Sequence, residues 1–499
     1  MEIQEIKSIL DFAAFCKRAG IVFQNSEIYG GFAGFYDFGP RGVEIKNKIK
    51  QSWWQRFVHE REDMAGIDGT IVTHPRVWEA SGHLAGFNDI LADCPKCKTR
   101  VQADHLIEDV LGREGELLSL EKVKELFSTY KKQLVCPKCK SELSEPRLYN
   151  TMFKTFVGPI QDDKNAAFMR PETAQVIFTN FKTVADSSRL KLPFGIAQIG
   201  KSFRNEIAPR DFLFRVREFE QMEVEYFVHP KKVDECPDFK KFEKVKLNVW
   251  TSDAQKKKQP HKQMTFKELV DNKQANKWLA YWLAQGYTWF VDNGVKPENL
   301  RIREHHKEEL AHYAMACFDL EYNFPFGWKE LFGAADRGQF DLKQHSSFSK
   351  QDLSIYDEET KEKVLPHVAA EPSFGVERAF LVYLMDAYTV EKDRIVLKLN
   401  PRLAPIQVGI FPLMKKDKMP EKGREIYESL KKEFICEYDE SGSIGKRYRR
   451  MDEIGTPFSI TIDYDSVEKD IVTVRHRDTM KQDKVKVSEL RDFLRKSFV

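Results

Sequence analysis

The sequence has no long run of apolar residues, and none of its hydrophobic stretches approaches the roughly 20 residues that a membrane-spanning helix needs. It also has no excess of charge of one sign, because 80 lysines and arginines against 77 aspartates and glutamates leave a formal net charge of +3. Net charge therefore does not indicate a nucleic-acid binder, and any basic surface has to be local. These absences predict a soluble globular protein with no membrane contact.

Cysteine is scarce, with eight among 499 residues. Four of the cysteines are scattered, at Cys16, Cys236, Cys317 and Cys436. This usage favours a reducing cytoplasm over a disulfide framework, so we expect no disulfides. Residues 1–20 have the pattern of an amphipathic helix ended by Gly20, and we expect neither a signal peptide nor a transit peptide. The charged residues on which this expectation rests are Glu2, Glu5, Lys7, Asp11, Lys17 and Arg18.

The other four cysteines form two identical motifs, Cys94-Pro-Lys-Cys97 and Cys136-Pro-Lys-Cys139. Each motif is a tight turn that can direct two thiolates at one tetrahedral ion. A catalytic dithiol needs only one such motif, and a disulfide pair is unusual in a reducing compartment, so the repeat favours a structural zinc site. The polar residues 104–132 between the motifs predict an inserted, partly helical module that the metal clamps.

Two predicted strands joined by a basic loop span residues 195–227. Because side chains alternate along a strand, each strand has one polar and one apolar face. The polar faces hold Gln198, Ser202, Arg204 and Glu206 in the first strand and Phe219, Gln221, Glu223 and Glu225 in the second. The loop contains Arg210, Arg215 and Arg217, which can close over a polyanion such as a nucleotide.

The first of these strands also fits the phosphate-loop pattern GxxxxGK[ST], from Gly195 to Ser202. Such a loop has to follow a strand and precede a helix. Here Ile196, Ala197 and Ile199 give the supposed loop the pattern of a strand, so we discount a phosphate-loop NTPase and a nucleotide role for Lys201.

Two elements are predicted upstream. Residues 41–60 have an apolar residue at about every helical turn and predict a long amphipathic helix. Residues 67–75 predict a strand that Pro75 ends, because proline lacks a ladder donor. Without further context, a plain surface helix and an edge strand explain both patterns.

Residues 240–303 are rich in lysine and include a segment with several tryptophans and tyrosines. An inserted module near RNA is one interpretation, and a solvated face is the other. The aromatic residues are Trp278, Tyr281, Trp282, Tyr287 and Trp289. The nearby His305, His306 and His312 lack a metal-binding spacing, so we expect them to be hydrogen-bonded or exposed.

Two segments further along have charged residues at the ends of predicted elements. Residues 328–337 have the composition of a strand and contain Glu330 and Arg337. Residues 367–375 precede an apolar helix whose first turn contains Arg378, and Gly375 permits a close backbone approach at the turn between them.

A new unit begins at Leu403. The pattern predicts a strand at 406–411, a helix at 421–434, a loop at 442–450 and strands at 458–463 and 471–475, which together indicate a compact α/β domain. In the predicted loop, Tyr448 is flanked by four lysines and arginines, which could contact phosphates while the tyrosine ring contacts a base.

Taken in order, these segments resemble the three motifs of class II aminoacyl-tRNA synthetases. The helix and strand ending at Pro75 are similar to the first motif, Phe203-Arg204-Asn205-Glu206 with the loop to Phe219 to the second, and Gly375-Val-Glu-Arg378 to the third. The chain most closely resembles the homodimeric glycyl-tRNA synthetases, over nearly its whole length. The resemblance implies an α/β (α+β) fold with an antiparallel sheet flanked by helices and a C-terminal α/β anticodon-binding domain.

The resemblance also implies a division of the chain. The expected parts are a catalytic core at 1–93, 151–239 and 305–402, a zinc-knuckle insertion at 94–150, an inserted module with possible tRNA contact at 240–304, and an anticodon-binding domain at 403–499.

By the same resemblance, Arg204 and Arg378 are catalytic. Arg204 would hold the amino-acid carboxylate and the α-phosphate, Glu206 the adenine amino group, and Phe219 and Arg378 the two faces of adenine. The implied ATP-binding residues are Arg204, Asn205, Glu206, Phe214, Arg215, Phe219, Glu330, Leu331, Gly375 and Arg378. Arginines and Mg²⁺ can neutralise the developing charge, so no side-chain base is needed.

Glycine selection requires acids around an ammonium and no room for a side chain. The implied glycine-binding residues are Arg100, Glu172, Phe219, Gln221, Glu223, Arg337, Glu371 and Ser373. Ser373 stands where the class usually has glycine and is expected to help fill the pocket, so that overpacking excludes a methyl group without an editing domain.

The implied activity is activation of glycine with ATP and transfer to tRNA(Gly), by a cytoplasmic homodimer with structural Zn²⁺. An alternative is a catalytically inactive, synthetase-like accessory protein that binds nucleic acid. Because Arg204, Glu206, Phe219 and Arg378 are all present, the sequence favours the enzyme.

Overall fold

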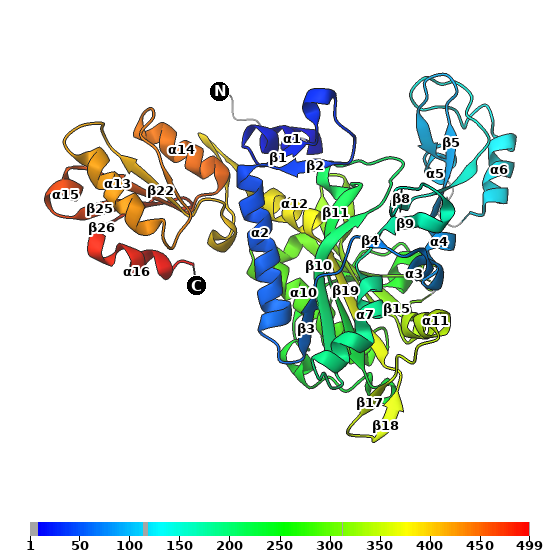
Figure 1. Ribbon diagram of the computed structural model, residues 1–499. Coiled ribbons are helices and arrows are strands. Elements are labelled where there is room, and N and C mark those ends of the chain that lie inside the picture. Colours follow the sequence, from blue (N-terminus) through cyan, green and yellow to red (C-terminus); the bar gives the residue numbers. More distant parts are fainter. Residues whose placement is uncertain (1–7, 113–117, 312, 499) are drawn as a thin grey trace.

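The computed structural model describes residues 8–112, 118–311 and 313–498. A large central body carries a small module at one end and a separate C-terminal domain at the other (Figure 1). The expected N-terminal helix is present as α1 (Ile9–Arg18), while positions 1–7 of that expectation lie outside the described residues. No helix in the described ranges is both long and apolar enough to cross a membrane.

A nine-stranded sheet forms the centre of the body, in the order β13-β12-β14-β15-β16-β19-β11-β10-β3. Neighbouring strands are antiparallel except in the β12–β14 and β10–β3 pairs, which are parallel. This confirms the expected antiparallel sheet. The strands are β3 (Met64–Ile67), β10 (Phe194–Phe203), β11 (Glu218–Val228), β12 (Lys246–Trp250), β13 (Lys262–Thr265), β14 (Leu300–Glu304), β15 (Ala316–Phe324), β16 (Gly327–Asp336) and β19 (His367–Gly375).

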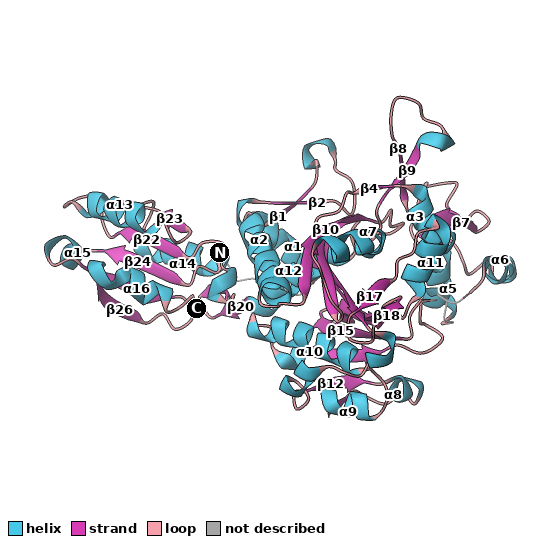
Figure 2. Ribbon diagram, turned by 60° about the horizontal axis from the view of Figure 1, so that its bottom comes forward, coloured by secondary structure: helices cyan, strands magenta, loops and turns pink. Residues whose placement is uncertain are grey.

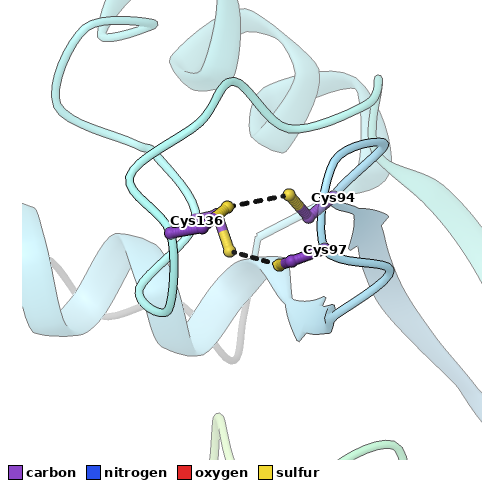
Figure 3. Close-up of side chains that lie close together, drawn as sticks. Cys94, Cys97 and Cys136 are labelled. Carbon is purple, nitrogen blue, oxygen red and sulfur yellow. Dashed lines mark hydrogen bonds between the residues drawn. The ribbon is translucent and has the colours of Figure 1, made fainter.

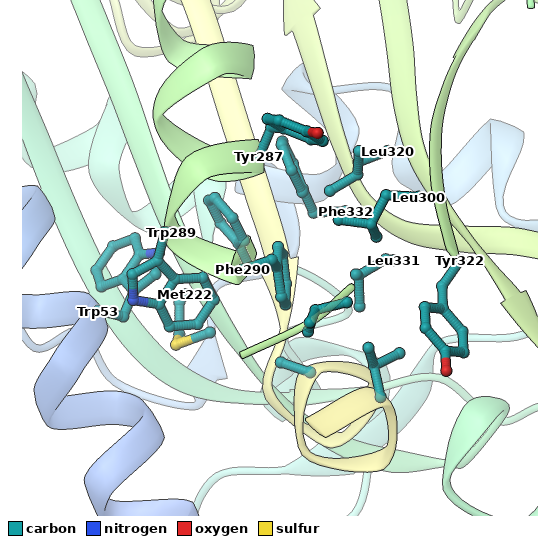
Figure 4. Packing of buried hydrophobic residues seen from close by; sticks show 14 of the residues in the cluster. Trp53, Met222, Tyr287, Trp289, Phe290, Leu300, Leu320, Tyr322, Leu331 and Phe332 are labelled. Atoms are coloured by element: carbon teal, nitrogen blue, oxygen red, sulfur yellow. The ribbon is translucent and has the colours of Figure 1, made fainter. Parts of the chain in front are cut away.

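Helices cover both faces of this sheet. On one face α2 (Pro40–Trp54), α10 (Lys277–Asp292) and α12 (Val376–Ala387) bury the main core, part of which Figure 4 shows. Phe332 and Phe374 stack there with ring centroids 4.3 Å apart. Gly286 lets α10 approach closely, because a Cβ at this position would lie 2.4 Å from the Phe332 ring. On the other face, α7 (Ala174–Ser187) and α11 (Phe340–Ser349) pack on a smaller core.

The first-motif segment differs in part from its prediction. The helix is present as α2 and continues through a π-helical turn at Gln55–His59. The single strand expected at 67–75 is instead divided, because β3 pairs with β10 in the large sheet whereas β4 (Val72–Thr73) pairs with β9 (Ala166–Met169) in a small one. Pro75 begins α3 (Pro75–Ala80), where its missing N–H costs nothing.

Residues 240–304 extend the central body. Their strands β12 and β13 form one edge of the large sheet, and all five tryptophans and tyrosines of α10 lie in the main core. Strand pairing and aromatic burial thus join this stretch to the large sheet, and its assignment as an inserted module stays a prediction. A contact of this stretch with tRNA stays a prediction.

The cysteine-containing module has its own sheet and its own core. Strands β5 (Asn88–Asp93), β6 (Arg100–Gln102) and β7 (Arg147–Asn150) pack with α5 (Ala103–Leu111) and α6 (Leu120–Thr129). Residues 113–117, within the stretch expected to be polar and partly helical, lie outside the described residues.

The C-terminal domain is a five-stranded sheet in the order β23-β22-β24-β25-β26 with helices around it, set apart from the body in Figure 2. It buries its own core. The expected loop at 442–450 is wrong: residues from Ile444 form α14, and Arg447 is buried and donates to the carbonyls of Pro412 and Asp439. The elements are β22 (Val408–Pro412), α13 (Met419–Leu430), β23 (Cys436–Tyr438), α14 (Ile444–Ile454), β24 (Phe458–Ile462), α15 (Tyr464–Glu468), β25 (Ile471–His476), β26 (Gln482–Lys486) and α16 (Leu490–Arg495).

Smaller elements complete the chain. They are β1 (Val22–Gln24), β2 (Tyr36–Phe38), α4 (His83–Gly86), β8 (Phe153–Phe156), α8 (Ser252–Lys256), α9 (Phe266–Asp271), β17 (Ile355–Asp357), β18 (Glu362–Val364), β20 (Tyr388–Glu391) and β21 (Arg394–Leu397).

Candidate active site

A cavity of about 600 Å³ opens over the polar face of β11, β16 and β19. The register of the sheet creates its floor, because Glu223 pairs with Ser373 and Gln221 with Gly375 across β11 and β19. The loop between β10 and β11 and the first turn of α12 form its walls. The predicted site residues that line it are Arg204, Glu206, Phe214, Arg215, Phe219, Gln221, Glu223, Glu172, Glu330, Glu371, Ser373, Gly375 and Arg378.

One end of the cavity combines arginines with aromatic rings. Nη1 of Arg378 lies 2.9 Å from Oε2 of Glu330, and its guanidinium carbon is 4.6 Å from the centre of the Phe214 ring. Arg204 lies 5.4 Å from the centre of the Phe219 ring. Cations beside flat rings suit the phosphates and the base of a nucleotide.

Hydrogen bonds from two arginines hold the second-motif segment in place at the same end of the cavity. Nε of Arg215 donates to Oε2 of Glu206 over 2.7 Å, and Nε of Arg204 donates to the carbonyl of Pro171 over 3.1 Å. The basic loop is thus anchored at its start and near its end. Arg210 and Arg215 line the cavity, whereas Arg217 does not line it and donates to the carbonyls of Glu206 and Ala33.

The other end of the cavity is acidic. Glu371 accepts from Nη1 of Arg337 over 2.7 Å, and Glu172 lies 3.0 Å from Nε2 of His83. Ser373 accepts from the Gln221 amide over 3.2 Å. Carboxylates around a small space suit a compact cation such as an ammonium group.

Burial and neighbouring charges shift the pKa values of these acids in opposite directions. Burial alone would raise the pKa of Glu172, but His83 and Arg337 hold that pKa below its ordinary value. Burial, with the charges of Glu223 and Glu172, raises the pKa of Glu371 to about 8 despite Arg337. Such divergent shifts among neighbours are typical of functional sites.

The four motif cysteines converge in the inserted module, as Figure 3 shows for three of them. The Sγ atoms of Cys94 and Cys139 are 3.4 Å apart, and those of Cys97 and Cys136 are 3.6 Å apart. A tetrahedral zinc with bonds of about 2.3 Å requires sulfur atoms about 3.8 Å apart, so the donor set and its spacing fit zinc.

Comparison with known proteins agrees with this geometry. Residues 153–387 match the model of the tRNA synthetase class II core domain (G, H, P, S and T), and residues 407–497 match the model of the anticodon binding domain. The chain is 45% identical over 497 residues to a glycine-tRNA ligase of Alkaliphilus oremlandii, which covers 98% of each protein. The chain belongs to the glycine-tRNA ligase family.

Two further members of the family are equally similar over nearly their whole length. The identity is 46% over 500 residues with a glycine-tRNA ligase of Caldanaerobacter subterraneus, covering 98% of each protein. It is 45% over 497 residues with that of Geobacillus thermodenitrificans, covering 97% of each.

Four residues expected in the family's substrate site do not line the cavity. Arg100 lies on β6 of the cysteine-containing module, where its side chain is 61% exposed beside Asp93. Leu331 is buried in the main core because side chains alternate along β16 and Glu330 takes the cavity side. Asn205 donates to the hydroxyl of Tyr149, and Arg337 is buried and donates to Glu371.

Sequence reasoning also missed residues that complete this site in a member of the glycine-tRNA ligase family. His83 pairs with Glu172, Thr173 donates to Glu223, and His305 lies 2.7 Å from Asp319, which lines the cavity. Thr173 could have been predicted, because it directly follows Glu172 in the sequence. His83 could not, because it lies in a distant short helix that no local sequence pattern connects to the site.

An ionic cluster lies behind the nucleotide end of the cavity. Nζ of Lys46 on α2 is 2.7 Å from Oε1 of Glu377 and 3.2 Å from Oε2 of Glu220. Oε2 of Glu377 accepts from the backbone N–H of Glu220 over 2.8 Å. Since Glu377 precedes Arg378 and Glu220 follows Phe219, this cluster joins all three motif segments.

Proposed function

We propose that this protein activates glycine with ATP to form glycyl-adenylate and then transfers the glycyl group to the 3′ end of tRNA(Gly). The observation that carries the proposal is one cavity that joins an arginine-rich, aromatic end to an acidic end. A nucleotide at one end and glycine at the other would meet at Arg204 and Gln221. The names of the similar proteins support the same activity.

In the first step, a carboxylate oxygen of glycine attacks the α-phosphorus of ATP, and the bond to the bridging oxygen of pyrophosphate breaks. Arg204 is the residue that would neutralise the attacking carboxylate and the α-phosphate, and Arg378 the terminal phosphate. Positioning and charge neutralisation are sufficient for such a displacement, so no general base is assigned.

Magnesium fits this site as the partner of ATP. The carboxylates of Asp319 and Glu330 line the cavity on the side of Arg378, and oxygen ligands of this kind suit Mg²⁺. When bound, the ion would neutralise phosphate charge.

Selectivity for glycine would come from the acidic end. The carboxylates of Glu172, Glu223 and Glu371 would attract the ammonium, while Ser373, held by Gln221, would occupy the space that a methyl group needs. This supports glycine over alanine without a second, hydrolytic site.

In the second step, a hydroxyl of the terminal ribose of tRNA attacks the carbonyl carbon of glycyl-adenylate, and AMP leaves. The domain at residues 407–497 would bind the anticodon, as the matched model indicates. We also propose a structural Zn²⁺ on the four cysteines and a homodimer formed through the α2 segment, working in the cytoplasm.

Glycine-dependent exchange of pyrophosphate into ATP tests the proposal. We expect exchange with glycine and little with alanine or proline. Absence of exchange, with tRNA binding retained, would support the inactive accessory protein; equal rates with alanine or proline would refute glycine selectivity.

A further inference from the structure

Glu225 is a buried acid that the proposed reaction does not use. It is the next residue after Glu223 on the same face of β11, and its side chain is 0% exposed. Neither of its carboxylate oxygens has a hydrogen-bond partner among the described residues. A buried ionised carboxylate without partners is strongly unfavourable, so its protonation state needs an explanation.

Acids outnumber bases around Glu225. One carboxylate oxygen from each of Glu223, Glu225 and Glu371 lies within 4.8 Å of the others. The facing charged groups are Glu223 on the same strand, Glu371 on β19, Arg337 after β16 and Asp341 on α11. The adjoining β10 places Ile196 opposite Glu225 and contributes no charge there.

Arg337 is already engaged by two acids. Its Nη1 donates to Glu371 over 2.7 Å, while Nε and Nη2 both donate to Asp341 over 2.8 Å. His83 is paired with Glu172. The Gln175 amide lies between Glu172 and His345 and hydrogen-bonds to both, so neither histidine is paired with Glu225. No described cation is left to pair with Glu225.

Two carboxylates this close in a buried site are not both ionised, so one of the two carries a proton. The directions of the shifts agree with this: burial and then the charge of Glu371 raise the pKa of Glu225 well above its ordinary value. Burial likewise raises the pKa of Glu371.

We infer that Glu225 and Glu371 share one proton in the free protein and release it to solvent when the ammonium of glycine enters the acidic end of the cavity. The inference rests on the proposed function. The incoming positive charge replaces the proton as the partner of the carboxylates, so no covalent bond other than that to the proton is broken. Glu225 acts through Glu371 and is a positioning residue.

Titration calorimetry of the full-length protein with glycine tests the inference. Binding is measured at pH 7 in two buffers with different enthalpies of ionisation, which gives the number of protons exchanged. We expect release of about one proton per glycine, and an apparent dissociation constant that falls up to about tenfold per pH unit before levelling near pH 8.

The Glu225→Gln variant separates this proton from a merely structural role. Glutamine occupies nearly the same volume and removes one of the two carboxyl groups that share the proton, so we expect glycine to bind within a few-fold of wild type with clearly fewer protons released. Glu428→Gln, on the exposed surface of α13, is the matched control and should keep wild-type proton release.

The wild-type measurement alone decides the matter if the variant does not fold. Glycine binding without proton release would overturn the inference while leaving the proposed function intact. Proton release unchanged in a folded Glu225→Gln variant would also overturn it. No glycine binding at any pH would refute the proposed function and this inference together.

Discussion

Replacing Lys46 by methionine tests the ionic cluster that joins the three motif segments. Methionine keeps most of the side-chain length but removes the ammonium group, whose Nζ lies 4.1 Å from the centre of the Phe38 ring. It removes the only charge within 3 Å of Glu377 that the described residues provide. Although burial would lower the pKa of Lys46, Glu377 and Glu220 raise it, so the native lysine is charged.

The expected loss of stability follows from the burial of the pair. The side chains of Lys46 and Glu377 are 11% and 7% exposed. Removing one partner of a buried ion pair costs about 3 to 5 kcal/mol, because the other charge stays buried. Glu377 keeps the N–H of Glu220, and Lys50 stays 3.3 Å from Glu220, so we expect a value near 3 kcal/mol, the lower end of this range.

The variant should also weaken nucleotide binding more than glycine binding. Glu377 and Glu220 each adjoin a residue of the nucleotide end, Arg378 and Phe219, whereas the acidic end has separate supports. We therefore expect the KM for ATP in pyrophosphate exchange to rise by about tenfold, with the KM for glycine nearly unchanged. A purely structural loss would move both together.

Denaturant unfolding and exchange kinetics measure these two effects. Lys50→Met is the control, because Lys50 is 26% exposed and its loss should cost less than about 1 kcal/mol. In a double-mutant cycle, Glu377→Gln should add little to Lys46→Met. If Lys46→Met unfolds within 1 kcal/mol of wild type, or if Lys50→Met loses as much, the reasoning is refuted.

Three further predictions concern the metal, the phosphate-loop pattern and glycine selection. Metal analysis should give about one zinc per chain, and Cys94→Ser should lose it and destabilise the inserted module; a zinc-free wild type as stable as the metal-loaded protein would contradict this. Lys201→Ala should leave exchange activity within a few-fold, because Lys201 lies on β10 in an exposed ion pair with Glu218, and a loss of a hundredfold would restore a phosphate role. Ser373→Gly should raise alanine-dependent exchange relative to glycine by about tenfold, as 1 to 3 kcal/mol per methyl implies, and unchanged discrimination would show that Ser373 does not fill the pocket.

Local patterns predicted the strands of the site well. Alternation over residues 195–227 placed the two strands close to the observed β10 and β11, since a period of two is visible in the letters themselves. The same alternation correctly rejected the phosphate loop. The turn at Gly375 and the helix after it were predictable for a similar reason, because an apolar helix follows a strand directly.

Pairing between distant segments was not predictable in this way. Residues 240–304 are rich in lysine, but two of their strands, β12 and β13, extend the large sheet at one edge. This is determined by the pairing of β12 with β14, which the local sequence does not indicate. Similarly, Gly442 and Gly445 indicated a loop, but Ser443 precedes a helix that a buried Arg447 ties to β22. In both cases tertiary contacts outweighed local composition.

The acids of β11 show which property of a site the sequence predicts and which property requires the structure. Alternation placed Phe219, Gln221, Glu223 and Glu225 on one polar face, and this prediction treated them as one floor. The structure divides them: the first three line the cavity, while Glu225 does not line it and is near the charges of Arg337 and Asp341. The glutamate proposed to contact glycine and the glutamate proposed to hold a proton have the same pattern in the sequence, and only the packing of distant elements against the strand distinguishes their surroundings.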